Sequence, residues 1–180
     1  MEYVYQIALS YATENEDIVE AVYHYLHAEG ISVFWASTPE GQRVLSGKNQ
    51  QEIFYEIFGV KSEYVALFVS KDYVRKFVPM QEARIAIAKH GENGSVIPIY
   101  LDGTALPEEL FDARKTNYYK SSNSAEIASH LAGKIKKNER KIAERTGATE
   151  IQDSKKIMKI NNNIAEKQIF IHTYNGSIEL

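Results

Sequence analysis

"SEYVALFVS", residues 62–70, is the most apolar strand-like stretch of the sequence, and it decides the fold. Branched and aromatic side chains follow one another in it, without the polar alternation of a strand that faces water on one side. Such a run is typical of a strand inside a parallel sheet that is covered on both faces. We therefore expect the rest of the chain to supply helices for both faces.

Strand and helix patterns alternate on either side of this central stretch. Further strands are predicted at 3–11, 31–35, 95–101 and 116–120, and helices at 18–30, 50–60, about 79–90 and 124–147. The alternation predicts an α/β protein with a flavodoxin-like, three-layer domain and a five-stranded parallel sheet. Ligands bind such sheets beyond the carboxyl ends of the strands. Those ends are Ser10–Tyr11, Trp35–Ala36, Ser70–Lys71 and Leu101–Asp102.

The composition narrows the class of protein. With 180 residues, 44% of them hydrophobic and 25% charged, the chain has the make-up of a soluble globular domain. Its net charge of −3 gives no overall positive field for nucleic acid or an anionic membrane. The absence of cysteine excludes disulfides, thiolate catalysis and cysteine-bound metals. No signal-peptide pattern or membrane-length apolar run is present, so we expect a cytoplasmic protein.

A long polar segment and an unusual tail stand out along the chain. Residues 36–49 read as a polar loop, long for a connection in a compact domain. Near the C-terminus, Asn175 and Gly176 lie between alternating segments and predict a β-hairpin. We expect a domain over 1–137 and a C-terminal extension over 138–180, made of a charged helix end, a linker and this hairpin. Because an isolated hairpin is marginal in water, we expect the extension to pack against a neighbouring subunit.

Glu82 is the carboxylate with the strongest case for chemistry. It follows Pro79 at the predicted start of a helix, where a carboxylate gains about 0.3–1 kcal/mol from the helix dipole, so a simple helix-end charge is one interpretation. This helix comes directly after the central strand, however, and Glu82 should lie near the carboxyl edge of the sheet. Glycine-rich phosphate loops and metal-ligand spacing of histidines are both absent from the sequence, and no metal site is predicted.

Aromatic residues are also predicted near the carboxyl edge. They could stack on a flat nucleobase or nicotinamide, or they could belong to the core; they are Tyr11, Phe34, Trp35, Tyr73 and Phe77. Trp35 directly precedes the polar loop, so we expect it to be exposed there.

Four motifs occur in order along the chain: "IALSYA" (7–12), "GISVFW" (30–35), "FVSKDYV" (68–74) and "IPIYLDGTALP" (97–107). Together they resemble bacterial Toll/interleukin-1 receptor (TIR) domains, over about residues 3–137. The resemblance implies a flavodoxin-like domain that cleaves NAD⁺ at the nicotinamide–ribose bond and releases nicotinamide with ADP-ribose or a cyclised product. Glu82 occupies the position of the family's catalytic glutamate. NAD⁺ is then the substrate, and no bound cofactor is expected.

The resemblance also assigns roles to other residues. It places substrate-binding groups at Ser10, Tyr11, Ala12, Phe34, Trp35, Phe77 and Val78. The loop from Ala36 through Ser37 and Gly41 to Gly47 looks like the family's BB loop, which shapes the site and takes part in assembly. The chain departs from the family at Val78, where many bacterial members have tryptophan, and at Ala36, where an acidic residue is common.

Three functions are consistent with these features. The first is an NAD⁺ glycohydrolase that is activated by self-assembly in bacterial antiphage defence or cell suicide. The second is a non-catalytic module that binds other TIR domains through residues 36–47, or mimics a host signalling protein. The third, a phospho-accepting domain of the response-regulator kind, needs an acidic cluster, for which Asp17 and Asp102 are the candidates. None of the three involves nucleic acid or a membrane.

Overall fold

The structure is a computed structural model that describes residues 3–112 and 114–144. The first compact unit of the chain ends at Ile135, and the described residues after it, 136–144, are helical. The hairpin predicted around Asn175 and Gly176 lies outside the described residues, as does most of the predicted extension.

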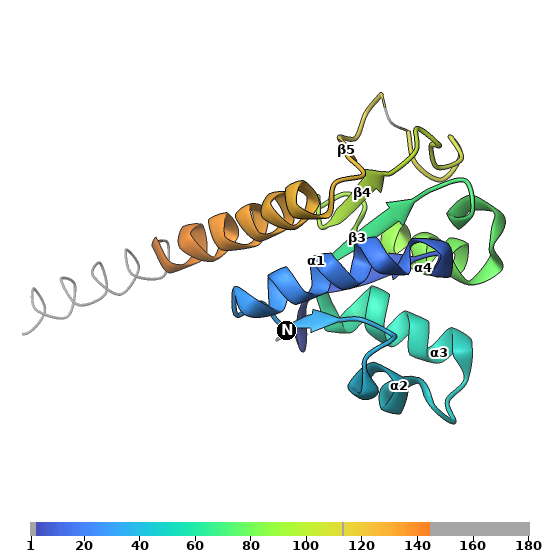
Figure 1. Ribbon diagram of the computed structural model, residues 1–180, viewed down its shortest axis with the longest axis horizontal. Helices are drawn as coiled ribbons and strands as arrows, with labels where there is room; N and C mark the ends of the chain where they lie inside the picture. Colours follow the sequence, from blue (N-terminus) through green and yellow to red (C-terminus); the bar gives the residue numbers. More distant parts are fainter. Residues whose placement is uncertain (1–2, 113, 145–180) are drawn as a thin grey trace, which may run out of the picture. The chain divides into compact units, whose positions relative to one another are not determined.

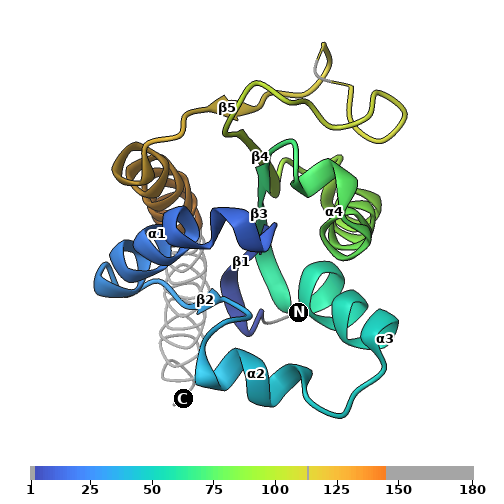
Figure 2. The same ribbon diagram turned by 45° about the vertical axis from the view of Figure 1, so that its right-hand side comes forward.

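Five parallel strands form one sheet (Figure 1), and their order is β2-β1-β3-β4-β5 (Figure 2). The strands are β1 (Tyr5–Tyr11), β2 (Val33–Phe34), β3 (Ser62–Val69), β4 (Val96–Tyr100) and β5 (Tyr119–Lys120). The apolar stretch that opened the sequence analysis is β3, the central strand, and every residue in it except Glu63 is buried. This order is that of flavodoxin-like folds, so the predicted fold class is confirmed.

The two edge strands are shorter than predicted. β2 and β5 contain two residues each, whereas the sequence predicts five residues for each of them. Both lie at an edge of the sheet and have a partner on one side only. Their neighbouring residues therefore have no second strand to hold them in extended backbone pairing.

Helices cover both faces of the sheet, as predicted. They are α1 (Glu16–Ala28), α2 (Pro39–Leu45), α3 (Gln50–Phe54), which continues into a π-helical segment (Tyr55–Lys61), α4 (Phe77–His90), a helix over 124–144, and two short 3₁₀ helices at Thr13–Asn15 and Tyr73–Arg75. In Figure 2, α1 and the start of the helix at residue 124 lie on one side of the sheet, and α3 and α4 lie on the other.

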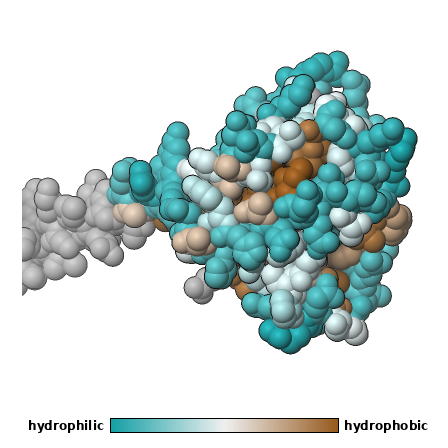
Figure 3. Space-filling view, viewed as in Figure 1, coloured by the Kyte–Doolittle hydropathy of each residue, from teal (hydrophilic) through white to brown (hydrophobic). Residues whose placement is uncertain are grey.

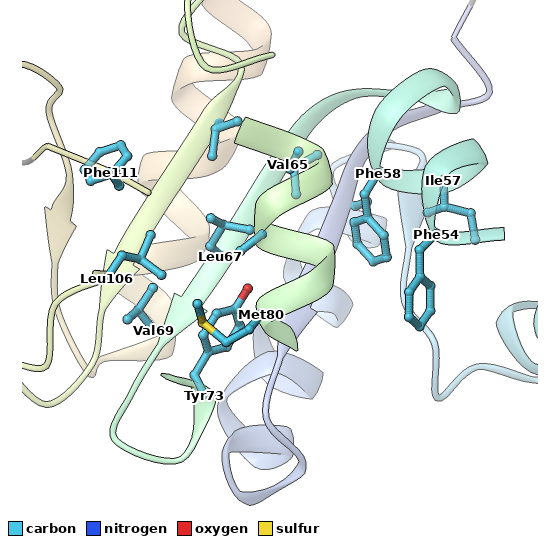
Figure 4. Close-up of a cluster of buried hydrophobic side chains, with 14 of the residues drawn as sticks. Phe54, Ile57, Phe58, Val65, Leu67, Val69, Tyr73, Met80, Leu106 and Phe111 are labelled. Atoms are coloured by element: carbon cyan, nitrogen blue, oxygen red, sulfur yellow. The ribbon is translucent and has the colours of Figure 1, made fainter. Parts of the chain in front are cut away.

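A separate hydrophobic cluster fills each side of the sheet. Beneath α3 and α4, residues such as Phe58, Leu67 and Met80 pack together (Figure 4). On the opposite side, Val22 of α1 and Leu131 of the last helix belong to the second cluster. Alternate residues of β3 belong to the two clusters, as the period-two geometry of a strand requires.

Two local predictions about helices are wrong. The segment 36–49, predicted as loop, contains helix α2, because the Thr38 side chain caps its start and Pro39 suits its first position. Helix α4 begins at Phe77, which puts Pro79 in the first turn as expected, but Glu82 lies in the second turn rather than just inside the helix start. The dipole effect is concentrated in the first turn, and the helix-end explanation for Glu82 therefore loses its basis.

One face of the molecule is mostly polar. Figure 3 shows one face as largely hydrophilic, in teal and white, with a hydrophobic area in brown near its centre. Among the described residues, no helix has the length and apolar character needed to cross a membrane.

Candidate active site

Glu82 lies at the carboxyl edge of the sheet and is almost completely buried. Its side chain, on the second turn of α4, has an exposed fraction of 9%. Ser10, the next-to-last residue of β1, donates a hydrogen bond from its Oγ to Glu82 Oε2 at 2.6 Å. A residue of the central sheet thus holds the carboxyl group that the sequence identified as the best candidate for chemistry.

Tyr73 completes a buried hydrogen-bonded chain with these two residues. It lies on the 3₁₀ helix that follows β3, has no exposed surface, and places its hydroxyl 2.7 Å from Ser10 Oγ. The backbone N–H of Tyr73 donates to Ser70 Oγ at 3.2 Å, and Ser70 Oγ donates to Asn15 Oδ1 at 2.7 Å. The ends of β1 and β3 and the start of α1 are thereby tied together around Glu82.

Burial controls the ionisation of this site. Loss of solvation raises the pKa of Glu82 to about 8, and the hydrogen bond from Ser10 acts in the opposite direction. Burial also raises the pKa of Tyr73 well above its ordinary value, with a further contribution from the negative charge of Glu82. Near neutral pH, Glu82 is therefore mainly protonated and Tyr73 keeps its hydroxyl proton.

The first residues of the 36–47 loop are attached to the same edge. The Tyr11 hydroxyl lies 2.7 Å from Ser37 Oγ and accepts a hydrogen bond from Trp35 Nε1 at 3.0 Å. Ser37 Oγ also donates to a carboxylate oxygen of Glu16 at the start of α1. Because Tyr11 directly follows Ser10, the loop entrance and the Glu82 network are anchored by adjacent residues of β1.

Close packing within this loop requires a glycine at position 41. It is buried in α2, and a Cβ atom at this position would overlap the carbonyl oxygen of Trp35. Thr38 adds to the same junction, since its hydroxyl donates to Trp35 O at 3.0 Å and accepts from Gly41 N–H at 2.9 Å. Gly47, at the end of the loop, has a positive φ of 73°, a conformation that favours glycine.

The predicted substrate-binding residues divide into buried and exposed groups. Ser10, Ala12 and Phe34 are buried, and the Phe34 ring packs against Tyr5 and Phe58 in the core. The expectation that Trp35 is exposed is wrong: its exposed fraction is 7%, because its ring packs on Tyr23 and its indole N–H bonds Tyr11.

Phe77 and Val78 are accessible at the start of α4. Phe77 is 66% exposed and Val78 is 36% exposed, and Val78 precedes Glu82 by four residues on the helix. Residues four apart lie on the same helix face, one turn from each other. Val78 therefore lies on the same helix face as Glu82, one turn earlier, and it is accessible to solvent.

Sequence reasoning missed the hydrogen-bonding role of Tyr73. It treated Tyr73 as a possible stacking surface, but a ring with no exposed surface cannot stack on a ligand. A signal for the actual role exists: a tyrosine just after the central strand is expected to be buried, and a buried tyrosine hydroxyl needs a partner. Which partner it finds depends on strand pairing, which the sequence alone does not give.

A groove of about 490 Å³ lies beside the edge strand β2. Its lining comes from α1, β1, β2 and residues 35–43 and includes Tyr23, Trp35 and Arg43, while Glu82 is not part of it. Within residues 3–112 and 114–144, no three metal-binding side chains cluster, and none of the site residues above suggests a metal ligand set.

The comparison with protein families agrees with this geometry. The family model for the TIR domain matches residues 7–135. The chain belongs to the TIR domain family. This span includes Ser10, the 36–47 loop, Tyr73 and Glu82, so the whole network lies inside the matched residues.

One curated protein and one solved structure are similar to this chain. The chain is 32% identical over 142 residues to the 3' cyclic ADP-D-ribose synthase AaTIR of Aquimarina amphilecti, an alignment that covers 76% of this chain and 42% of that protein. The chain therefore spans less than half the length of that relative. The TIR domain of the Toll-related receptor TRR-2 of Hydra magnipapillata superimposes with a TM-score of 0.50 at 18% identity, over 64% of this chain and 83% of that one. This second likeness concerns the fold alone.

Proposed function

We propose that this TIR domain cleaves NAD⁺ at the nicotinamide–ribose bond, with Glu82 as its catalytic carboxylate. The observation that carries the proposal is the position of Glu82, buried at the carboxyl edge of the sheet and hydrogen-bonded to Ser10. The likeness to a 3' cyclic ADP-D-ribose synthase supports the same reaction class, because that product's name indicates an ADP-ribosyl group.

The chemistry needs one well-placed negative charge. Breaking the N-glycosidic bond builds positive charge on the ribose, as in glycosidase transition states. An ionised Glu82 would stabilise that charge and accept hydrogen bonds from the ribose hydroxyls, and it would be most effective where water is excluded. Nicotinamide leaves as a neutral molecule, so no strong general acid is required.

The ADP-ribosyl group that remains must be captured by an oxygen nucleophile. Water gives ADP-ribose, whereas a hydroxyl of the same molecule gives a cyclic product. The likeness to AaTIR supports the cyclic route for this chain as part of the proposal. Phe77 and Val78, exposed in the first turn of α4, are the proposed apolar contacts of the substrate.

The experiment is to follow nicotinamide release from NAD⁺ by the full chain and to identify the second product by mass. Glu82→Gln keeps the shape of the side chain and removes its charge, and should lower the rate by at least about 100-fold. Glu92→Gln, on an exposed turn, is the matched control and should leave the rate unchanged. An inactive wild-type protein, or an active Glu82→Gln variant, would rule the proposal out.

The wider role belongs to the same proposal. We infer a cytoplasmic enzyme of bacterial antiphage defence or cell suicide that is activated when TIR domains associate through the 36–47 loop. Membership of the TIR family supports association, and the firm attachment of the loop entrance to Tyr11 and Glu16 gives it a fixed geometry. Specific activity should then rise with protein concentration.

A second candidate function is a non-catalytic module that binds other TIR domains. The observation in its favour is that Glu82 is buried and mainly protonated near neutral pH. Intact NAD⁺ at every protein concentration, together with association that changes in the 36–47 loop abolish, would establish this function instead.

A further inference from the structure

The hydroxyl of Tyr73 is a buried polar group that the proposed mechanism does not use. Figure 4 shows the Tyr73 ring beside Met80, within the apolar cluster beneath α4. Its hydroxyl is 2.7 Å from Ser10 Oγ, and Ser10 Oγ is 2.6 Å from Glu82 Oε2. A hydroxyl in such surroundings is costly unless it is hydrogen-bonded, so the contact with Ser10 is the one that this position requires.

The direction of the two hydrogen bonds follows from counting protons. An ionised Glu82 can only accept, so Ser10 must use its single hydroxyl proton on Glu82. Ser10 can then only accept from Tyr73, which becomes the donor at the start of the chain. A donor to Ser10 polarises the Ser10 hydroxyl and strengthens its bond to the carboxylate.

We propose that Tyr73 is a positioning residue whose hydroxyl acts through Ser10 to orient the Glu82 carboxyl group and to favour its ionised form. This inference rests on the proposed function, because ionised Glu82 is the form that stabilises the ribose cation. Tyr73 has no exposed surface, and it affects the reaction only through Ser10.

Other ionisable groups do not offer Glu82 the same support. Helix α4 packs against the 3₁₀ helix at Tyr73, the π-helical segment, α3, β1 and β4. On α4 itself the other titratable side chains are Arg84, Lys89 and His90. Those on the neighbouring elements are Tyr73 and Arg75; Tyr55, Glu56 and Lys61; Glu52; Tyr5 and Tyr11; and Tyr100. Tyr73 and Tyr11 respond to the charge of Glu82, and Lys61 pairs with Glu56. Burial and the Ser10 bond are the influences on the pKa of Glu82 itself.

Removal of the Tyr73 hydroxyl should therefore destabilise the ionised form of Glu82 more than its protonated form. Hydrogen bonds in a chain that ends on a charge are stronger than neutral ones, so the charged state loses more when the first donor is deleted. Tyr73→Phe keeps the ring and its packing. In this variant, the acid side of the pH profile of kcat/KM should lie about 0.5–1 pH unit higher than in the wild type. At pH values below it, kcat/KM should be roughly three- to tenfold lower than that of the wild type.

The test compares the pH profile of NAD⁺ cleavage by the full chain and three variants. Tyr73→Phe should have the displaced acid limb and regain most of the wild-type rate at high pH. Ser10→Ala should displace the limb further, and the double variant should match Ser10→Ala alone, because Tyr73 acts through Ser10. Tyr100→Phe, which removes another buried tyrosine hydroxyl, should leave the profile unchanged.

A substrate-free measurement separates this inference from the proposed function. The Glu82 carboxyl carbon can be titrated by ¹³C NMR and identified by its absence in Glu82→Gln. In Tyr73→Phe it should titrate at higher pH than in the wild type, even if NAD⁺ is never cleaved. An unmoved Glu82 titration in Tyr73→Phe overturns the inference, and so does an equal displacement in Tyr100→Phe. A general packing defect in Tyr73→Phe would lower activity at all pH values and leave the pH at which Glu82 titrates unchanged.

Discussion

Glu82 combines two properties that oppose each other, since a catalytic carboxylate must ionise and a buried one resists ionisation. Burial raises its pKa to about 8 from an ordinary value of 4.5. Between these two values the folded state holds one proton more than the unfolded state. The free energy of unfolding therefore falls as the pH rises through this window, by at most about 1.4 kcal/mol per pH unit from this group.

Glu82→Gln should remove this part of the pH dependence, because an amide does not ionise. We expect the variant to gain stability relative to the wild type as the pH rises from about 5 to about 8. Urea unfolding at several pH values measures the difference. For Glu92→Gln, on the exposed turn, the free energy of unfolding should depend on pH as it does in the wild type. A constant difference between Glu82→Gln and wild type across this range would contradict the raised pKa.

Gly41 offers a second test at the scale of one residue. A methyl group there would overlap the carbonyl oxygen of Trp35, so Gly41→Ala should lower the free energy of unfolding by about 1–3 kcal/mol. Gly133→Ala is the matched control, because its added methyl would meet open space in a helix and should be neutral or stabilising. Equal effects of the two changes in thermal unfolding would show that the Gly41 contact is unimportant.

For single residues, the sequence predicted the location in the fold better than the burial of the side chain. Glu82 was placed at the correct edge, but its burial depends on how α4 lies over the sheet. Trp35 was expected in solvent because it precedes a polar segment, yet Tyr23 and Tyr11 cover it from elements distant in sequence. Tyr73 lies 63 residues from Ser10, and their contact requires the pairing of β1 with β3.

Among the elements, α2 is the one whose formation most affects the candidate site. Its N-terminus is capped by the Thr38 hydroxyl, which also bonds Trp35 O at the end of β2. Thr38→Ala removes both bonds and should cost about 1 kcal/mol, with faster hydrogen exchange in residues 39–45. Thr38→Ser retains the hydroxyl and should stay close to the wild type. Unchanged exchange in Thr38→Ala would mean that tertiary packing alone fixes α2.

The elements that the sequence predicted well are those with a strong internal pattern. The unbroken apolar run of β3 and the helical spacing of Ile18, Val22, Tyr25 and Leu26 in α1 identify a central strand and a surface helix, and Val22 and Leu26 are buried as this pattern predicts. Helix α2 was not predicted because its seven residues have little hydrophobic periodicity and because Thr38 was not recognised as its capping residue. The edge strands were overestimated because a strand's length depends on its partners.

At the scale of the whole molecule, the strand order creates the site. The chain crosses from β1 to β2 on one side of the centre and from β3 to β4 on the other, so the loops after β1 and β3 diverge at the carboxyl edge. Ser10, near the end of β1, and Tyr73, just after β3, meet beneath Glu82 there. The fold and the hydrogen-bonded network thus depend on the same topology. The alternation of strands and helices predicted the fold class, whereas the pairing of β1 with β3 that joins Ser10 to Tyr73 came from the structure.

The C-terminal part of the chain leads to the last prediction. In the helix over 124–144, buried residues occur up to Ile135, and none of the described residues 136–144 is buried. A chain that ends after Lys137 therefore keeps the described core contacts of this helix. If the predicted hairpin packs against a neighbouring subunit, this truncation should fold but lose self-association, as measured by light scattering during gel filtration. A truncation after Asn163 removes the predicted hairpin alone and should behave in the same way. If either truncated protein self-associates as strongly as the full chain, the hairpin is not the contact.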